Sequence, residues 1–105
     1  MAYIMSRRVE FEWDPRKDEA NRRRHGISFE EAKELFTSGV DFLELFDAEH
    51  SEDEDRFIAI GPSTRGVILV VYTERLEGVF RIISARGATR AETRMLWQYL
   101  EGKDE

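Results

Sequence analysis

The stretch VILVVYTERLEGVFRIISARGATRAE, residues 67–92, decides the fold that this sequence predicts. Its first part, residues 67–73, is apolar at odd and even positions alike, which is typical of a central strand covered on both faces. The Leu-Glu-Gly segment at 76–78 indicates a turn, and residues 79–85 form a second apolar run. We therefore expect the two runs to pair as an antiparallel hairpin.

Local patterns on either side of this hairpin predict the other elements. Alternating apolar residues indicate strands, whereas proline, glycine and capping-box spacings mark where helices begin and end. The expected elements are a strand, two short helices, two further strands and, after the hairpin, a C-terminal helix: residues 9–13, 15–25, 28–39, 40–46, 56–60 and 89–100.

This order predicts a single α+β domain over residues 1–105. An N-terminal strand and two short helices precede an antiparallel four-strand meander, and the last helix follows it. Helices on one face of the meander are expected to leave the opposite face as a shallow open surface. We expect residues 1–8 to be an extension and residues 102–105 a frayed tail.

Composition narrows the possible functions. The chain contains no cysteine, which removes disulfides, thiolate metal sites and cysteine nucleophiles. Its longest apolar run, residues 67–72, is far shorter than the ~18 residues that a membrane span needs. The acidic residues 52–55 lack the glycine and the spacing of a calcium loop. We expect a soluble, cytoplasmic protein with no cofactor, no metal and no membrane partner.

The net charge of −6 is concentrated in the middle of the chain. Residues 1–29 carry seven basic and five acidic groups (+2), residues 30–56 carry two and eleven (−9), and residues 57–105 carry seven and six (+1). Most basic residues are arginines, which suit two-pronged contacts to phosphate or carboxylate. A local phosphate site on the flanks is therefore compatible with the acidic total.

Four polar residues, Arg81, Ser84, Arg86 and Arg90, interrupt the second apolar run and the start of the helix after it. On a regular strand Ser84 and Arg86 share one face with Ile82, while Arg81 faces the other side. Arg90 lies in the first helical turn, where the helix dipole disfavours a cation unless an anion is present. A bound phosphate would supply this anion.

Spacing alone favours a plainer interpretation of these arginines: surface salt bridges to Glu74, Glu77 or Glu92. Arg56 and Arg75 stand at strand ends, where either solvation or convergence on the same face would explain them.

Two histidines and two tryptophans have functional and structural interpretations. His25 is the natural candidate for proton transfer at neutral pH, yet a histidine before Gly26 is also a common helix C-cap. His50, among acids, is expected to be solvated. Trp13 is in phase with the apolar residues of the first strand, which favours a core position, whereas Trp97 could stack on a base.

Six segments of the chain, taken together and in this order, match the motifs of a known family: FEWD (11–14), NRRRHG (21–26), ISFEEA (27–32), RFIAIG (56–61), VVYTER (70–75) and RIISARGATRAE (81–92). Together they resemble the BrnT toxins, ribonuclease toxins of type II toxin–antitoxin systems in the RelE/ParE-like superfamily. The resemblance implies a RelE-like α+β fold and metal-independent RNA cleavage that inhibits translation. It also implies neutralisation by a ribbon-helix-helix antitoxin, BrnA, whose complex with the toxin represses its own operon, so DNA is contacted only through that complex.

The matching motif positions and the arginine pattern together give a candidate site. We expect His25, Arg75 and Arg86 to be catalytic, and RNA phosphates to bind the remaining polar residues of the set, Arg56, Arg81, Ser84 and Arg90. Trp97 and Tyr99 are the expected antitoxin contacts.

The chain departs from the family pattern at Gly87, Thr93 and Leu96, where the family usually has two basic residues and a tyrosine. These departures favour the alternative, a non-enzymatic RelE/ParE-like interaction module that acts only with its antitoxin or another protein target.

Overall fold

The computed structural model describes residues 9–102. The expectations for residues 1–8 and 103–105 lie outside the described residues. Along the chain the helices and strands are β1 (Glu10–Glu12), α1 (Pro15–His25), α2 (Phe29–Thr37), β2 (Leu43–Phe46), a short 3-10 helix η1 (Ala48–His50), β3 (Phe57–Ser63), β4 (Gly66–Leu76), β5 (Val79–Gly87) and α3 (Arg90–Gly102). Gly102, expected in a frayed tail, is the last residue of α3.

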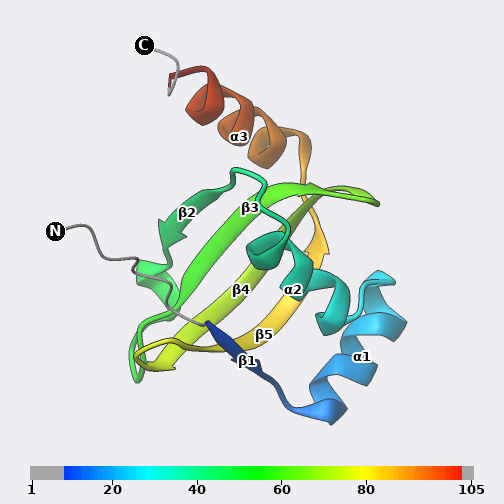
Figure 1. Ribbon diagram of the computed structural model, residues 1–105, viewed down its shortest axis with the longest axis vertical. Helices are drawn as coiled ribbons and strands as arrows, with labels where there is room; N and C mark the ends of the chain where they lie inside the picture. Colours follow the sequence, from blue (N-terminus) through cyan, green and yellow to red (C-terminus); the bar gives the residue numbers. More distant parts are fainter. Residues whose placement is uncertain (1–8, 103–105) are drawn as a thin grey trace, which may run out of the picture.

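One mixed sheet holds the five strands in the order β1-β5-β4-β3-β2 (Figure 1). Strands β2 to β5 are antiparallel neighbours in chain order. The predicted N-terminal strand is a fifth strand added to the expected four-strand meander: β1 joins the sheet at its edge, parallel to β5. Phe11 of β1 is drawn to that edge by ring contacts with Phe80 of β5 and Phe36 of α2, at 5.8 and 5.5 Å between centroids.

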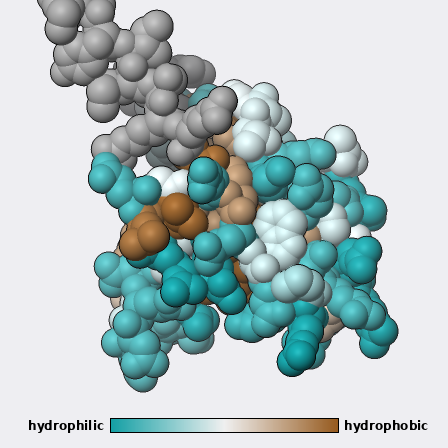
Figure 2. Space-filling model, turned by 60° about the horizontal axis from the view of Figure 1, so that its bottom comes forward, coloured by the Kyte–Doolittle hydropathy of each residue, from teal (hydrophilic) through white to brown (hydrophobic). Residues whose placement is uncertain are grey.

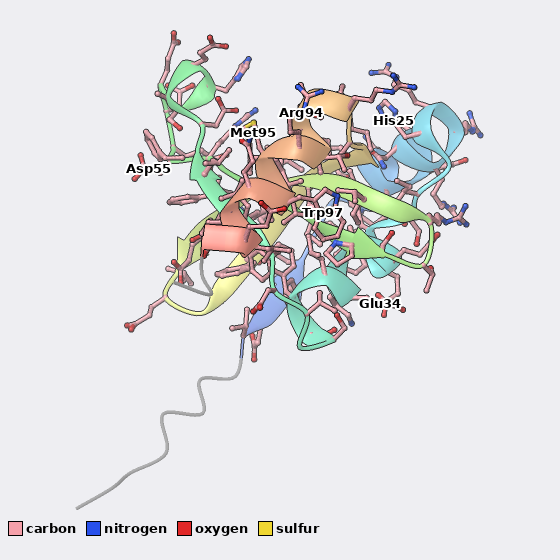
Figure 3. All side chains as sticks on the ribbon, turned by 90° about the horizontal axis from the view of Figure 1, so that it is seen from above. His25, Glu34, Asp55, Arg94, Met95 and Trp97 are labelled. Atoms are coloured by element: carbon pink, nitrogen blue, oxygen red, sulfur yellow. The ribbon has the colours of Figure 1, made fainter. Side chains whose placement is uncertain are left out.

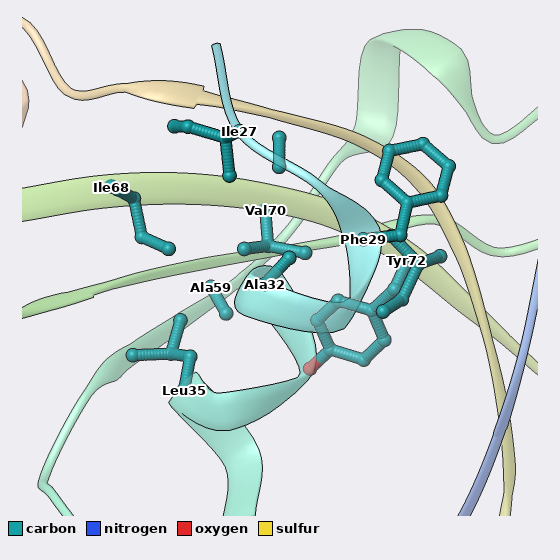
Figure 4. Close-up of a cluster of buried hydrophobic side chains, with 10 residues drawn as sticks. Ile27, Phe29, Ala32, Leu35, Ala59, Ile68, Val70 and Tyr72 are labelled. Atoms are coloured by element: carbon teal, nitrogen blue, oxygen red, sulfur yellow. The ribbon is translucent and has the colours of Figure 1, made fainter. Parts of the chain in front are cut away.

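Helix α2 lies across one face of the sheet, in front of it in Figure 1, whereas α1 lies beside the edge of β5. α2 presents Phe29, Ala32 and Leu35 to this face, and each is at most 2% exposed. They pack against inward side chains of the sheet, among them Val70 and Tyr72 (Figure 4). The apolar face predicted for this helix is therefore confirmed, and it forms the main core.

The sequence predicts that the second face of the sheet is open, but α3 covers part of it. α3 crosses one end of it, where Leu96 is completely buried against Leu43, Ile60 and Leu69. Strands β3 and β4 carry apolar residues on both parities, which explains this arrangement because each face of the sheet then needs a cover. An open part of this face remains beyond α3.

Helix ends follow the capping signals in the sequence. Asp14 accepts a hydrogen bond from the Arg16 N–H at 2.8 Å and begins α1, and Gly26 ends it with φ of 74°, a left-handed conformation that favours glycine. Ser28 and Glu31 form a complete capping box at α2. The capping box predicted at Thr89 and Glu92 is also present, with reciprocal bonds of 2.8 and 3.1 Å.

A β-bulge in β5 changes which residues face the helices. Val71 pairs with Ser84 and Tyr72 pairs with Ile82, so Ile83 has no partner on β4. The expected strict alternation is wrong here, because the extra residue shifts the parity of the strand. Ile82 and Ala85 both enter the main core, and Ser84 and Arg86 lie on the opposite face.

Candidate functional site

Ser84 lies where two hollows meet on the surface. The first, which we call the sheet hollow, is on the open face and has a volume of about 340 Å³. Its polar lining includes Ser84 and Arg86 of β5, Arg56 just before β3, His50 of η1 and Glu92 of α3. The β-bulge at Ile83 turns both Ile83 and Ser84 toward this hollow, so a local irregularity of β5 builds the centre of the site.

The second hollow, the helix hollow, has a volume of about 200 Å³ and lies between α1 and β5. It is lined by Lys17, Asn21, Arg24 and His25 of α1, and by Ile83 and Ser84 of β5. The two hollows therefore adjoin at Ile83 and Ser84, which line both of them.

Arg86, an expected catalytic residue, is held by a carboxylate of the protein. Its two terminal nitrogens donate to the two oxygens of Glu92 at 2.8 and 2.9 Å. This hydrogen bonding lowers the pKa of Glu92 to about 2 and raises the pKa of Arg86. The charge of Arg86 is thus largely compensated, and the guanidinium is fixed in orientation. The plainer interpretation that named Glu92 as a partner is confirmed for this arginine.

Arg75 and Arg81 share one carboxylate, that of Glu12 in β1. The distances from their nitrogens to a Glu12 oxygen are 3.6 Å for Arg75 and 2.9 Å for Arg81. Neither residue lines the two hollows at Ser84. The structure therefore groups these two arginines at the β1 end of the sheet, away from Ser84.

Arg56 differs from these three arginines. It has no carboxylate partner among residues 9–102, and its Nε is buried without a hydrogen bond to any of them. Its backbone is fixed, because its N–H donates to Ser51 Oγ at 2.9 Å and its carbonyl accepts from Asp47 N–H at 2.8 Å. The side chain thus lines the wall of the sheet hollow without an ion pair to the described residues, and it also borders an adjoining hollow lined by Glu49, Glu52, Asp53 and Glu54.

The position predicted for His25 at the end of a helix is confirmed, whereas its role in proton transfer stays a prediction. It is the last residue of α1, before the left-handed Gly26, and its exposed side chain also lines the helix hollow. In Figure 3 it stands at the end of α1, on the upper side of the view with Arg94, while Glu34 lies on the lower side. The structure brings His25 and Ser84 to the same hollow.

His50 is exposed, as expected, but the sequence interpretation missed its contact with Asp47. Asp47 Oδ2 lies 3.0 Å from His50 Nδ1, and both residues line the sheet hollow. A carboxylate on Nδ1 fixes the ring and turns the other nitrogen outward, an arrangement that suits proton transfer. The signal was present as the spacing of three residues in Asp-Ala-Glu-His, which one helical turn brings together.

The remaining predicted residues lie on α3. Arg90 and Trp97 line a third hollow on this helix, together with Thr93 and Arg94, and not the hollows at Ser84. Trp97 and Tyr99 are exposed, at 46% and 41%. Trp13, in contrast, packs edge-on against Phe29 at 6.2 Å, which confirms it as a core residue.

Within the described part of the chain, no group of three or more His, Cys, Asp or Glu side chains is arranged to hold a metal ion. No helix between residues 9 and 102 is long and apolar enough to span a bilayer.

Residues 13–92 match the family model for the "Ribonuclease toxin, BrnT, of type II toxin-antitoxin system". The chain belongs to the BrnT family. Among solved structures it is similar to the ribonuclease toxin BrnT of Brucella abortus, with 23% sequence identity and a TM-score of 0.58 over 78% of this chain and 99% of that one. At this identity the likeness shows a shared fold, an α+β architecture with three helices and a five-strand mixed sheet. No curated protein matches the chain.

The family match confirms the resemblance inferred from the six segments. BrnT proteins are ribonuclease toxins of type II toxin–antitoxin systems, so the site around Ser84 can be considered as a candidate for RNA chemistry.

Proposed function

We propose that this BrnT-family protein is a metal-independent endoribonuclease that inhibits translation and is neutralised by a BrnA-type antitoxin. The observation that supports this most is the shared position of Ser84. It links Arg56 and Arg86 in the sheet hollow to His25 in the helix hollow. Cations, a hydroxyl donor and an imidazole therefore surround one surface that a phosphate could occupy.

The proposed reaction is attack of an RNA 2′-hydroxyl oxygen on the adjacent phosphorus. The P–O5′ bond breaks, and the products are a 2′,3′-cyclic phosphate and a 5′-hydroxyl. One proton leaves the 2′-oxygen and one joins the 5′-oxygen, so the reaction balances without a metal. Donors aimed at the phosphate oxygens stabilise the added negative charge, a contribution of about 3 kcal/mol for a well-placed donor.

The ion pairs described above change the roles that we propose for the expected arginines. Arg56 becomes the main phosphate-binding cation, because its charge has no carboxylate partner among the described side chains. Arg86 keeps a catalytic role through its fixed N–H groups, although Glu92 compensates its charge. Arg75 and Arg81 share a single anion, Glu12, and retain one net positive charge for phosphates farther along the strand.

Proton transfer is assigned to His25, with His50 as a second candidate. His25 shares the helix hollow with Ser84, and His50 shares the sheet hollow with it. Because an attacking and a leaving oxygen lie on opposite sides of a phosphorus, histidines in adjoining hollows suit one base and one acid. Ser84 is proposed to donate its hydroxyl to a phosphate oxygen.

Antitoxin binding is assigned to a different surface, on α3. The hollow there has a volume of about 590 Å³ and is lined by Trp97 and Arg90, whereas the exposed Tyr99 is not part of its lining. Aromatic residues and arginines of this kind are enriched in binding hot spots. The end of the sheet that carries the β4–β5 turn is a weaker choice, since Figure 2 shows it mostly hydrophilic with one small apolar patch. DNA contact is proposed only through the toxin–antitoxin complex.

The proposal also includes a RelE-like fold, a single domain and action in the cytoplasm. The packing of α2 and α3 on the two faces of one sheet supports a single domain.

A second candidate function, a non-enzymatic interaction module, is favoured by one observation. Glu92 and Glu12 compensate three arginines of the expected site, Arg75, Arg81 and Arg86. A phosphate would find fewer free charges there than the sequence suggests.

Incubation of purified protein with RNA in EDTA separates the two functions. We expect wild type to produce fragments that end in a cyclic phosphate. The variants Arg56→Ala, His25→Ala and His50→Ala should each lower the cleavage rate by about 100-fold or more. Arg22→Ala, an exposed change on α1 that touches neither hollow, serves as the control. Absence of cleavage by wild type, with free RNA and with ribosomes, would favour the interaction module.

A further inference from the structure

We propose that α1 carries a second phosphate-binding segment, Lys17 and Arg24, which extends the RNA path from Ser84 along the helix hollow. This inference rests on the proposed RNA cleavage and adds two residues, Lys17 and Arg24, to the candidate site. Both side chains are exposed and line the helix hollow beside His25.

The helix geometry places these two cations on one side of α1. Lys17, Asn21 and Arg24 are spaced by four and three residues, so they lie on the same face. Asn21 at the centre is buried and anchored to Ala85 of β5. Lys17 and Arg24 therefore flank a fixed point, one turn before it and one turn after it, and border the part of β5 that carries Ser84.

Their charges are free, in contrast to most arginines of the expected site. Neither Lys17 nor Arg24 forms an ion pair with another residue of the described range 9–102. On the same helix, Arg23 is paired with Glu19 at 2.6 Å. An anionic chain in the helix hollow would meet two uncompensated cations before it reaches Ser84.

Charge on the other side of the site gives the path a direction. Beyond Arg56 the surface is lined by the acidic residues Glu49, Glu52, Asp53 and Glu54. A polyanion is repelled there and attracted on the α1 side. The RNA backbone is therefore expected to run from Arg56 and Ser84 over β5 toward Arg24 and Lys17, and not across the acidic loop.

A single-stranded RNA ligand fits this track better than an acidic protein segment does. The helix hollow is shallow and polar, and it has no exposed aromatic anchor of the kind that α3 presents with Trp97. A chain of phosphates can use spaced cations without such an anchor, because each contact is electrostatic.

The test measures binding of a 2′-O-methyl oligoribonucleotide, which has no 2′-hydroxyl to attack and stays intact. Fluorescence anisotropy at several salt concentrations gives the slope of the logarithm of the binding constant against the logarithm of salt. For single strands each lost phosphate contact reduces this slope by about 0.7, so the double variant Lys17→Gln/Arg24→Gln should reduce it by about 1.4. Arg16→Gln/Arg22→Gln changes the net charge equally outside the hollow and should leave the slope near the wild-type value.

Equal slopes for the two double variants would overturn the proposal, and so would unchanged RNA binding together with lost binding to the co-expressed antitoxin. Thermal unfolding of the Lys17→Gln/Arg24→Gln variant checks that a weaker slope does not come from misfolding. If the protein cleaves RNA but the salt slope does not depend on Lys17 and Arg24, the phosphate-binding segment on α1 is contradicted and the proposed RNA cleavage stands. A slope that depends on them in a protein that cleaves no RNA supports the track and removes the enzyme.

Discussion

Asn21 of α1 binds both backbone groups of Ala85 in β5. Its side-chain oxygen accepts from the Ala85 N–H at 3.1 Å, and its side-chain nitrogen donates to the Ala85 carbonyl at 2.8 Å. The same nitrogen also donates to the carbonyl of Ile27 at 2.9 Å. The side chain acts as a neighbouring strand would, at an edge of β5 that β1 does not reach, because β1 pairs only with residues 79–81. It thereby fixes α1, and with it His25, beside Ser84.

Replacement of Asn21 by alanine should destabilise the protein strongly. The change removes three hydrogen bonds and leaves buried backbone groups of Ala85 without partners, at a cost of about 2–4 kcal/mol. The midpoint of urea unfolding measures this loss. Arg22→Ala, at the next and exposed position, is the matched control, and equal midpoints for the two variants would contradict the anchoring role.

Acid should weaken the fold through Glu92. Its pKa is lowered to about 2 by hydrogen bonds from Arg86, so its contribution is complete above the ordinary pKa of 4.5 and is lost as pH falls from about 5 toward 2. Because the pair is partly exposed, we expect about 1–2 kcal/mol. Glu31, whose pKa Arg65 lowers, adds to the loss in the same range.

The variant Glu92→Gln isolates this contribution. It should be less stable than wild type at pH 7 and approach it near pH 2, as followed by unfolding at each pH. A constant stability difference between the two proteins from pH 7 to pH 2 would show that the ion pair does not carry it.

The contribution of Glu44 to stability should depend on pH in the opposite direction. Burial raises its pKa, nearby Glu74 raises it further, and Tyr72 Oη donates a hydrogen bond to it. A raised pKa favours the neutral form in the folded state, so the contribution of Glu44 is complete below pH 4.5 and is lost as pH rises through its folded pKa. Glu44→Gln should therefore raise the melting temperature at pH 7 slightly and leave it unchanged near pH 4. A lower melting temperature at pH 7 would argue against this.

Arg56→Met should separate function from stability. Methionine fills a similar length without the buried Nε that has no hydrogen bond to the described residues, so we expect an unchanged or higher unfolding midpoint. RNA cleavage, in contrast, should fall about 100-fold, because a donor to the phosphate is lost. The control is Arg65→Met, since Arg65 pairs with Glu31 outside both hollows and its loss should spare cleavage. Equal cleavage by the two variants would assign the phosphate contact elsewhere.

Local signals made most of the fold predictable. The bounds of α1 follow from Asp14, Pro15 and Gly26, and both capping boxes act within four residues of chain. Apolar patterns located β3, β4 and β5, although β4 runs on to Leu76. The pairing of Arg86 with Glu92 was also within reach, since only six residues separate them.

Features that depend on distant contacts could not be predicted. Glu12 meets Arg81 across 69 residues only because β1 joins β5 in parallel, and no local pattern specifies that pairing. The bulge at Ile83 has no glycine or proline to announce it, yet it decides that Ser84 faces the open surface. The site therefore depends on the register of β5, which the order of residues alone leaves undetermined.

The most direct test of the RNA site is an NMR titration of ¹⁵N-labelled protein with a 2′-O-methyl oligoribonucleotide. We predict that backbone amide shifts concentrate at Arg56, Ser84 and Arg24, and that the amide of Trp97 on α3 stays unchanged. Shifts confined to the surface of α3 around Trp97, with none at Ser84, would contradict the placement of RNA on this part of the sheet.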